Sequence, residues 1–346
     1  MRSRQAVPCR NSSLGESCAA MSTIAFRSIG SGERDAVLDL LAEWYGDRAF
    51  FARYFEHDPT FCDELCFVAC DGPRIVSTFQ VFRKQVRSTA GVLQVAGVGN
   101  VFTTEAYRRR GIAFDLLQYG LHELRHHGFD VSLLFASRLE FYAALGYRSH
   151  PRFLTLLTGT AQQERVSAAT LRAVTASDLP AIRALYDDYC APRYATTVRD
   201  EAYWNGQMRY AGNPDELFLV ATENDRVVAY ARGTHLFDLY VIMEHAFVPG
   251  HASALVDLII AHHNQRAAQT PGTLAHLEHE PEVRSQLQAL GLASHRVEDV
   301  FCMWRPIDRG RLAEKLGANR AALDDASLWR ILFPPDQSVY WIADRF

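Results

Sequence analysis

The sequence lacks long apolar runs and any excess of positive charge. No stretch approaches the roughly 18 to 20 apolar residues that a membrane-spanning helix requires. The formal net charge is −4 and the isoelectric point is about 6.4, so the composition carries no basic signature of a nucleic-acid-binding protein. We therefore expect neither a membrane nor a nucleic acid among the partners of this protein.

Cysteine occurs seven times but never in a CxxC pair. An odd number of cysteines in a large chain without a secretory segment is typical of reduced thiols, so we predict a cytoplasmic protein. Cys62, Cys66 and Cys70 are candidate metal ligands by their spacing. Cys66 and Cys70, however, lie in an apolar run that is typical of a buried strand, and zinc usually takes more closely spaced ligand pairs. His122 and His126 lack an evident third ligand, so we predict packing thiols and no metal.

Apolar residues are plentiful: 48% of the chain is hydrophobic and 11% is aromatic, against 22% charged residues. This is enough to build sizeable cores, and 346 residues exceed one average domain. The first 20 residues differ, because they are polar and aperiodic and have no apolar segment of the kind found in signal peptides. We predict that residues 1–20 form a disordered extension without a function.

Strand-like and helix-like segments occur in an order that is repeated. In residues 21–160 the apolar spacing predicts strands at 24–28, 65–70, 75–87, 92–103, 131–135 and 152–157, and helices at 33–45, 48–55, 110–127 and 139–145. After a polar stretch a similar order returns in residues 166–305, with a last strand over 297–303. The order of strands and helices is repeated, but the amino-acid sequence is not. We predict an α/β fold with mixed (α+β) sheets, in two tandem domains at 21–160 and 166–305.

Residues 306–346 belong to neither copy. They are expected to form two short helices, 308–316 and 327–332, followed by an extended end. The last eight residues contain Tyr340, Trp341, Phe346 and two aliphatic residues, which is unusual for a free terminus. We therefore expect this tail to dock on the body of the protein.

The most informative stretch runs from Val95 to Tyr147. An expected strand ends at Thr103, three consecutive arginines begin at Arg108, and a long helix follows Gly111 directly. Backbone N–H groups at a helix start have no partner within the helix, and the helix dipole adds partial positive charge there. Small residues allow the backbone to approach a ligand closely, and arginines add charge-assisted hydrogen bonds. This pattern predicts a cradle for a pyrophosphate, with a solvated basic helix start as the alternative.

A second segment, Phe-Tyr-Ala-Ala-Leu-Gly-Tyr at 141–147, follows the cradle after the expected strand 131–135. Together with Arg108-x-x-Gly111-x-Ala113, which has the form (Gln/Arg)xxGx(Gly/Ala), it resembles the core of the GNAT N-acetyltransferase superfamily. The tandem layout with a degenerate second copy is similar to that of the Eis-type acetyltransferases. The resemblance extends over residues 22–305. In the first copy it includes the specific motifs, whereas in the second copy it concerns the architecture alone.

The resemblance implies acetyl-CoA as the co-substrate, no metal, and a role for each matching residue. Backbone groups of Val101 and Thr103 would hold the pantetheine arm and the thioester carbonyl. Tyr142 would be the general acid that protonates the departing thiolate, since a phenol is still protonated at neutral pH; a core aromatic on a short helix is the alternative for this residue. The pyrophosphate would be held by Arg108, Arg109, Gly111, Ile112 and Ala113, and Ser137 would lie beside the cofactor.

The corresponding turn of the second copy, Val-Pro-Gly-His-Ala at 248–252, contains no arginine. We predict that this copy binds no CoA and serves to shape the acceptor pocket or the assembly. The acceptor itself is expected at the aromatic-rich segment 44–55, because acceptors of the superfamily enter over the first two helices. Its candidate residues are Trp44, Phe51 and Tyr54, whose aromatic faces would suit a cationic amine.

The attacking amine must be neutral, so a base should take its proton. In Eis-type proteins the carboxylate of a terminal phenylalanine is thought to do this, after a sterol-carrier-like third domain. This sequence has only residues 306–346 in place of that domain, and it ends in Phe346. Our hypothesis is that the tail delivers the Phe346 carboxylate to the cleft of the first domain; a tail that packs only for stability is the alternative.

These features predict an N-acetyltransferase, an acyltransferase that moves the acetyl group of acetyl-CoA to a primary amine by direct attack. The expected acceptor is small and cationic, like an aminoglycoside or a polyamine. A lysine of a protein or peptide and the sugar-linked cysteine amine of a mycothiol-synthase-like enzyme are alternative acceptors. A non-catalytic acyl-CoA-binding regulatory module is the alternative from a different class. The sequence leaves open the acceptor, the acyl chain and whether the protein is a homo-oligomer.

Overall fold

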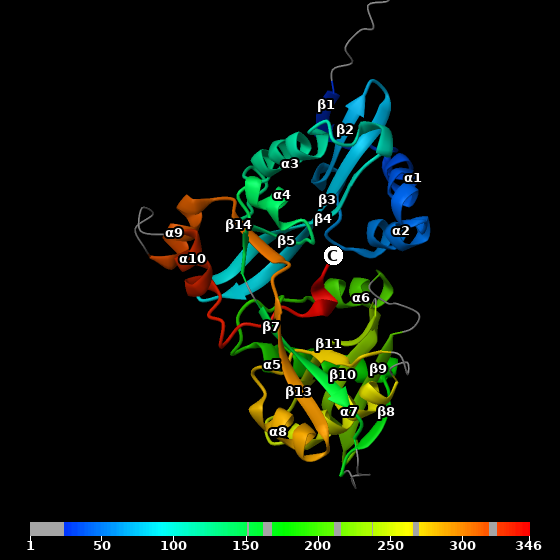
Figure 1. Ribbon diagram of the computed structural model, residues 1–346, viewed down its shortest axis with the longest axis vertical. Coiled ribbons are helices and arrows are strands. Elements are labelled where there is room, and N and C mark those ends of the chain that lie inside the picture. Colours follow the sequence, from blue (N-terminus) through cyan, green and yellow to red (C-terminus); the bar gives the residue numbers. More distant parts are fainter. Residues whose placement is uncertain are drawn as a thin grey trace, which may run out of the picture.

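A computed structural model describes residues 24–150, 152–161, 168–210, 216–236, 238–265, 270–317 and 324–346. Two mixed sheets of seven strands lie one above the other along the long axis of the molecule, each with helices on both faces (Figure 1). The predicted mixed α/β class with two units of similar design is thus confirmed. The N-terminal extension expected at 1–20 lies outside the described residues.

The first sheet has the strand order β1-β2-β3-β4-β5-β14-β6. Its strands are β1 (Ile24–Ser28), β2 (Cys66–Asp71), β3 (Arg74–Ser88), β4 (Gly91–Thr103), β5 (Val131–Phe135), β14 (Cys302–Pro306) and β6 (Arg148–Ser149). Its helices are α1 (Arg34–Tyr45), α2 (Arg48–His57), α3 (Ile112–Glu123) and α4 (Leu139–Ala144), with short 3-10 turns at Asp63–Leu65 and Glu105–Tyr107. We refer to this sheet and its four helices as the first unit.

The second sheet has the order β13-β7-β12-β11-β10-β9-β8. Its strands are β13 (Leu292–Asp299), β7 (Arg152–Gly159), β12 (Thr273–Ala275), β11 (Leu239–Phe247), β10 (Arg226–Leu236), β9 (Leu217–Glu223) and β8 (Thr170–Ala173). Its helices are α5 (Leu179–Cys190), α6 (Glu201–Tyr210), α7 (Ala252–Asn264) and α8 (Pro281–Ala289), with a 3-10 turn at Ala176–Asp178. This sheet and its helices are the second unit.

The closing strands of the two units are exchanged. β7 was expected to close the first copy, but it lies between β12 and β13 in the second sheet. The single strand expected over 297–303 is in fact two strands, of which β14 pairs with β5 and β6 in the first sheet. Alternating apolar residues direct a strand to a buried position but do not specify which sheet receives it. The sheets therefore divide the chain differently from the predicted boundaries at 160 and 166.

The side chains of β2 show how the first unit fills both faces of its sheet. Phe67 and Ala69 point into the core under α3, whereas Cys66, Val68 and Cys70 point into the core under α1 and α2. The thiols pack among apolar side chains, and burial raises the pKa of Cys66 to about 12. In the described residues no group of three His, Cys, Asp or Glu side chains is arranged to hold a metal.

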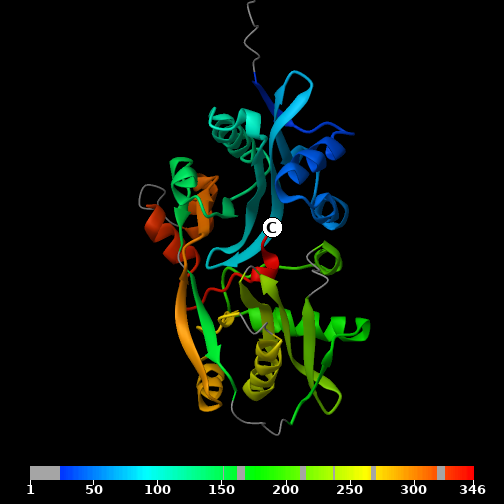
Figure 2. The ribbon, with the colours of Figure 1, turned by 45° about the vertical axis from the view of Figure 1, so that its right-hand side comes forward.

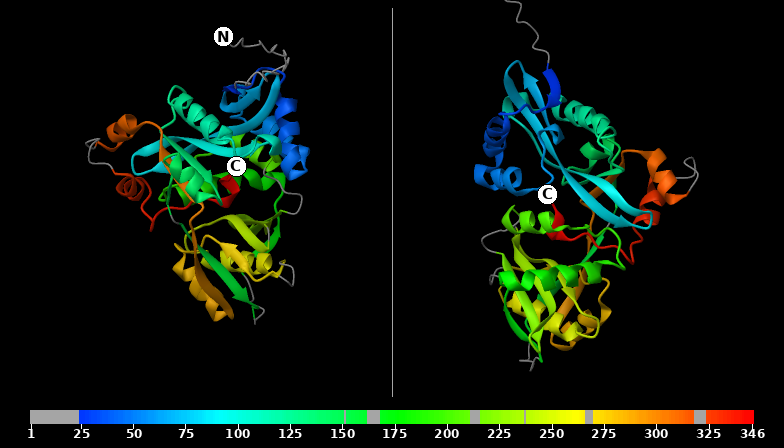
Figure 3. Two further views of the ribbon diagram at one scale, coloured as in Figure 1. Left: turned by 45° about the horizontal axis from the view of Figure 1, so that its top comes forward. Right: turned by 180° about the vertical axis from the view of Figure 1, so that it is seen from behind.

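The tail is a structural part of the body. Its helices α9 (Arg309–Leu316) and α10 (Asp325–Leu332) pack beside the first sheet, where the Trp304 ring of β14 lies 4.6 Å from that of Phe333. The chain then crosses between the two sheets, passes through a 3-10 turn (Ile342–Asp344) and ends beside β4 (Figures 2 and 3). Residues 339–344 are buried along this path.

Helix α3 is shorter than expected, because residues 124–128 form turns rather than a further helical turn. Its buried stripe contains Leu116, Leu117, Gly120 and Leu121. Gly120 lets the helix lie directly on the sheet, since a methyl group at this position would collide with the Phe79 ring of β3. No helix within the described ranges is long and apolar enough to cross a membrane.

We predict that Gly120→Ala destabilises the protein by about 1 to 3 kcal/mol, because the added methyl group overpacks the contact with Phe79. The measurement is the free energy of unfolding from urea titration. Gln118→Ala, at an exposed position of the same helix, is the matched control and should change it little. Equal effects of the two variants would contradict the close contact.

Candidate active site

The site begins where two parallel strands separate. β4 and β5 pair at Val95–Val131, Ala96–Ser132 and Gly97–Leu133, and their ladder ends there. Beyond this point, between the pairs Gln80–Gly99 and Thr78–Phe102, β4 contains one residue more than β3. Asn100, within this stretch of β4, takes a left-handed conformation with φ of 51°. Such a β-bulge bends the strand. The end of β4 therefore turns away from β5 and opens a wedge between them.

The turn between β4 and α3 has the backbone of an anion cradle. Gly111 is the N-cap of α3 with φ of 81°, and Arg109 is also left-handed with φ of 61°. No side chain caps the helix start, so its first N–H groups point outward at the positive end of the helix dipole. The Arg108 Nε donates to the Thr103 carbonyl at 2.9 Å, and its guanidinium lies 4.9 Å from the Trp44 ring centroid.

A cavity of about 1000 Å³ lies in front of this turn. The predicted cofactor residues all line it: Val101, Thr103, Arg108, Arg109, Gly111, Ile112, Ala113 and Ser137. Tyr142 from α4 and Trp44 from α1 line the same cavity. Residues from three separate stretches of the chain, at 44, 101–114 and 135–142, thus line one cavity.

Tyr142 is oriented by the turn that ends α4. Its carbonyl accepts hydrogen bonds from the N–H groups of Leu145 at 3.0 Å and Tyr147 at 3.1 Å, and the turn requires the positive φ of 87° at Gly146. The Tyr147 hydroxyl in turn lies 2.6 Å from Ser132 Oγ, which donates to the Ala96 carbonyl at 2.9 Å. Burial raises the pKa of Tyr147 far above its ordinary range, so this hydroxyl keeps its proton and can donate a hydrogen bond. The Leu-Gly-Tyr motif therefore fixes the backbone from which the Tyr142 side chain extends to the cavity.

Comparison with known proteins identifies this arrangement. Residues 25–149 match the family described as the acetyltransferase (GNAT) domain. The chain carries a GNAT acetyltransferase domain. Enzymes of this family are acyltransferases that use acetyl-CoA as the co-substrate.

Solved structures show the same fold over most of the chain. The GCN5-related N-acetyltransferase from Anabaena variabilis aligns over 85% of this chain and 75% of its own, with a TM-score of 0.65 and 16% identity. That from Kribbella flavida aligns over 84% and 72%, with a TM-score of 0.64 and 15% identity. Eis1 from Mycobacterium abscessus aligns over 85% and 76%, with a TM-score of 0.53 and 14% identity. Among curated proteins none matches the chain.

Phe346 lies in the wedge of the GNAT domain. Its ring is stacked on Phe82 of β3 at 5.5 Å and is 5.7 Å from Phe135, which also lines the cavity. Gly97 makes room for the ring, because a Cβ there would lie 2.5 Å from it. A Cβ on Gly99 would lie 3.3 Å from the Phe346 carbonyl oxygen. The tail thus brings its last residue to the point where β4 and β5 separate.

The three aromatic residues expected to bind the acceptor have different environments. Trp44 is 60% exposed and lines the cavity. Tyr54 lies edge-on to Phe82 at 5.6 Å, and burial raises its pKa to about 12. Phe51 is only 1% exposed and packs in the core under α1 and α2, so it does not face the wedge. Phe82 was not predicted from the sequence, because it is inconspicuous within the apolar β3; in the structure its ring packs against both Tyr54 and Phe346.

The equivalent turn of the second unit lies between β11 and α7. It has the same left-handed glycine, Gly250, with φ of 88°, but a histidine precedes the helix instead of the arginines. His251 Nδ1 lies 3.3 Å from a carboxylate oxygen of Glu223. A carboxylate beside the helix start disfavours a bound phosphate, which supports the prediction that this copy does not bind CoA.

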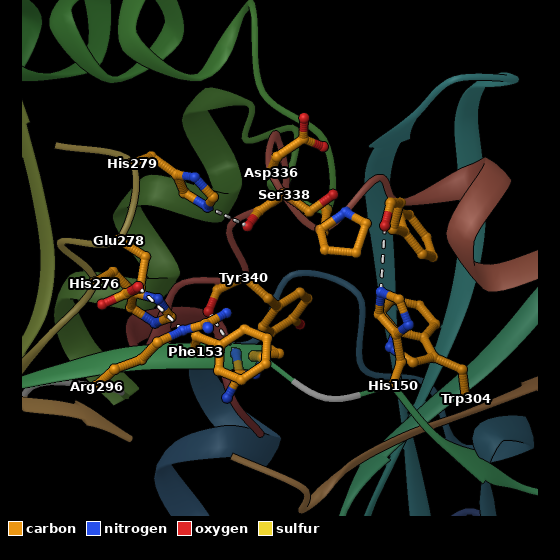
Figure 4. Close-up of a pocket in the computed structure, with 14 residues that line it drawn as sticks. His150, Phe153, His276, Glu278, His279, Arg296, Trp304, Asp336, Ser338 and Tyr340 are labelled. Carbon is orange, nitrogen blue, oxygen red and sulfur yellow. Dashed lines mark hydrogen bonds and ion pairs between the residues drawn. The ribbon is translucent and has the colours of Figure 1, made fainter. Parts of the chain in front are cut away.

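A second cavity, of about 450 Å³, lies where the tail crosses β7 and β14 (Figure 4). His279 Nε2 lies 3.1 Å from the Ser338 carbonyl oxygen, and His150 Nε2 lies 3.3 Å from that of Phe333. The Arg296 guanidinium covers the Phe153 ring at 3.5 Å. The two histidines thus tie the tail to both units, whereas the Arg296–Phe153 contact lies within the second sheet. No local pattern of residues indicates this cavity, because its lining comes from segments that are far apart in the chain.

We predict that Arg109→Gln weakens the binding of CoA by about tenfold to a hundredfold, the loss expected for a charge-assisted contact to the pyrophosphate. Binding of pantetheine, which has no pyrophosphate, should not change. Both constants are measured by calorimetry, with Arg226→Gln at the exposed start of β10 as the control. Equal weakening of both ligands would show that Arg109 does not meet the pyrophosphate.

Proposed function

We propose that this protein transfers the acetyl group of acetyl-CoA to a primary amine of a small cationic acceptor. One observation carries the proposal: the anion cradle at Arg108–Ala113 and the Tyr142 phenol line a single cavity at the wedge between β4 and β5. A phosphate site alone would support only binding. A proton donor placed in the same cavity as that site supports transfer.

The residues present fit acetyl-CoA. The outward N–H groups of the α3 start and the side chains of Arg108 and Arg109 would hold the pyrophosphate. Backbone groups of Val101 and Thr103, at the bent end of β4, would hold the pantetheine arm and the thioester carbonyl, and Ser137 would lie beside it. When bound, the co-substrate supplies an activated acetyl group.

Two protons must move during transfer, and the chain has a group for each. The C–N bond forms as the C–S bond breaks, so the amine loses a proton and the thiolate gains one. Tyr142 would give its phenolic proton to the sulfur. The Phe346 carboxylate, beside Gly99 in the wedge, would accept the amine proton. The position of Phe346 supports this role over a tail that packs only for stability.

The surroundings of Phe346 favour a small cation as the acceptor. The half-buried Tyr54 ring and the Phe346 carboxylate would provide the attraction that an ammonium-bearing molecule needs. Helix α2 contacts α6 of the second unit, so the second unit closes one side of this region. Such a cover favours a free polyamine or aminosugar over a lysine on the surface of a folded protein.

The experiment that tests the proposal is a thiol-release assay with acetyl-CoA and a panel of amines. The panel contains polyamines, aminoglycosides, lysine peptides and an aminosugar that carries a cysteinyl group. We expect release with the small cationic amines and little with the peptides. CoA binding without release from any amine would instead indicate a binding module.

We predict that Tyr142→Phe lowers kcat with the best amine by about a hundredfold, the lower range for loss of a general acid, and leaves the CoA dissociation constant unchanged. Tyr119→Phe is the matched control, because its half-buried ring packs against Phe26 and Phe67 of the sheet. Full activity of Tyr142→Phe would exclude the phenol as the proton donor.

A further inference from the structure

Asp344 is a buried carboxylate two residues before the end of the chain. It is 1% exposed. Its Oδ1 accepts hydrogen bonds from Arg199 Nε at 3.0 Å, the Tyr203 hydroxyl at 2.9 Å and Gln207 Nε2 at 3.2 Å. All three donors belong to the second unit, from the segment before α6 and from α6 itself. The second unit therefore binds the tail directly beside Phe346.

The cation that binds Asp344 is itself held in place. Arg199 also pairs with Glu244 of β11, which accepts a hydrogen bond from the Tyr230 hydroxyl at 2.7 Å. Its guanidinium lies 4.1 Å from the centroid of the Tyr186 ring. Both charged groups of the Arg199–Glu244 pair are fully buried. Buried charges hold their geometry tightly, because moving one leaves its partner unpaired in a medium of low polarity.

The same cluster reaches the first unit. Lys84 of β3 is buried and donates from Nζ to the Tyr203 hydroxyl at 2.7 Å. Just before Arg199, the Val198 N–H donates to the Gln85 carbonyl at 2.7 Å. Burial alone would raise the pKa of Asp344, but Arg199 and Lys84 hold it below its ordinary value. The carboxylate is thus ionised, bound directly by the second unit and linked to Lys84 of the first unit through the Tyr203 hydroxyl.

Further bonds fix the tail backbone around Asp344. Gln207 Nε2 donates to the Ala343 carbonyl at 2.8 Å, and Arg152 Nη1 donates to the Tyr340 carbonyl at 2.7 Å. Arg345 Nη2 donates to Asp299 at 2.8 Å. Phe346 is the next residue, and its ring fills the wedge against Gly97. The backbone of residues 340–345 therefore has little freedom to move, and neither has the Phe346 carboxylate that follows it.

We propose that Arg199, Tyr203 and Gln207 are positioning residues that, through Asp344, hold Phe346 at the wedge of the GNAT domain. The second unit, which lacks the arginines of the cradle, would then act in the reaction by holding Phe346 of the tail at the wedge of the first unit. The inference rests on the proposed function in one respect, the role of Phe346 as proton acceptor. A displaced Phe346 should lower turnover and leave the acetyl-CoA site as it is.

The test compares Asp344→Asn with Asp178→Asn in the full chain. Asp178 is a matched control, because it is also a buried carboxylate of the second unit, bound by Arg172 and Thr175 and not by the tail. Hydrogen exchange of the peptide that covers residues 337–346 reports the anchoring of the tail without any need for activity. For Asp344→Asn we expect about tenfold faster exchange in this peptide, and a fall in kcat of about tenfold or more with the KM for acetyl-CoA unchanged.

Two further variants make the outcome decisive. Tyr203→Phe removes one donor to Asp344 without removing a charge, and it should show the same changes in smaller degree if Asp344→Asn does not fold. One glycine added after Phe346 moves the carboxylate, and Asp344→Asn should cause no further loss in that background, because both changes displace the same group.

Unchanged exchange of the tail in both Asp344→Asn and Tyr203→Phe would overturn the inference. Additive losses of kcat with the glycine extension, or a parallel rise in the KM for acetyl-CoA, would overturn it as well. Failure of the proposed function gives a different result. In that case none of the amines causes thiol release by the wild-type protein, or the added glycine leaves turnover unchanged. Hydrogen exchange of the tail would still respond to Asp344→Asn.

Discussion

The candidate active site lies where β4 and β5 separate. The two strands share three register pairs, and the bulge at Asn100 then turns β4 away. Backbone groups that would otherwise bond across a sheet become available to a ligand at this point. The cradle of α3 and the Tyr142 phenol face the wedge from the first unit, and Phe346 enters it from the tail. The interrupted ladder thus opens the space that the cradle and Tyr142 line.

Local signals made part of this site predictable from the sequence. Gly111 and Gly146 need positive φ values, and each stands beside the residues it serves, so the cradle and Tyr142 could be found by their motifs. The aromatic helix α2 was predicted correctly, but the directions of its side chains were not. Phe51 and Phe55 form the stripe that packs into the core, whereas Tyr54 points toward β3. Asp344 and Arg199 carry no local signal, since their pairing joins residues far apart in the chain.

The second unit keeps the fold of the first and has a different surface chemistry. Its helix start at Gly250 lies beside a His251–Glu223 pair instead of arginines, whereas its interior contains the Arg199–Glu244 pair that supports the tail. The residues of the second unit that bind the tail therefore lie next to the first unit rather than at the turn around Gly250. The contact of α2 with α6 and the buried cluster at Asp344 show where the second unit meets the first.

The exchange of β7 and β14 also affects how the protein is made. A domain usually begins to fold as soon as its residues have left the ribosome. Here the first sheet lacks the strand between β5 and β6 until residues 302–306 have been synthesised, although every other strand of that sheet is complete by residue 149. The edge of β5 stays unpaired during that interval, and the Trp304 side chain that packs against α10 has yet to arrive. The first unit and its active site are therefore completed only after the second unit has been translated.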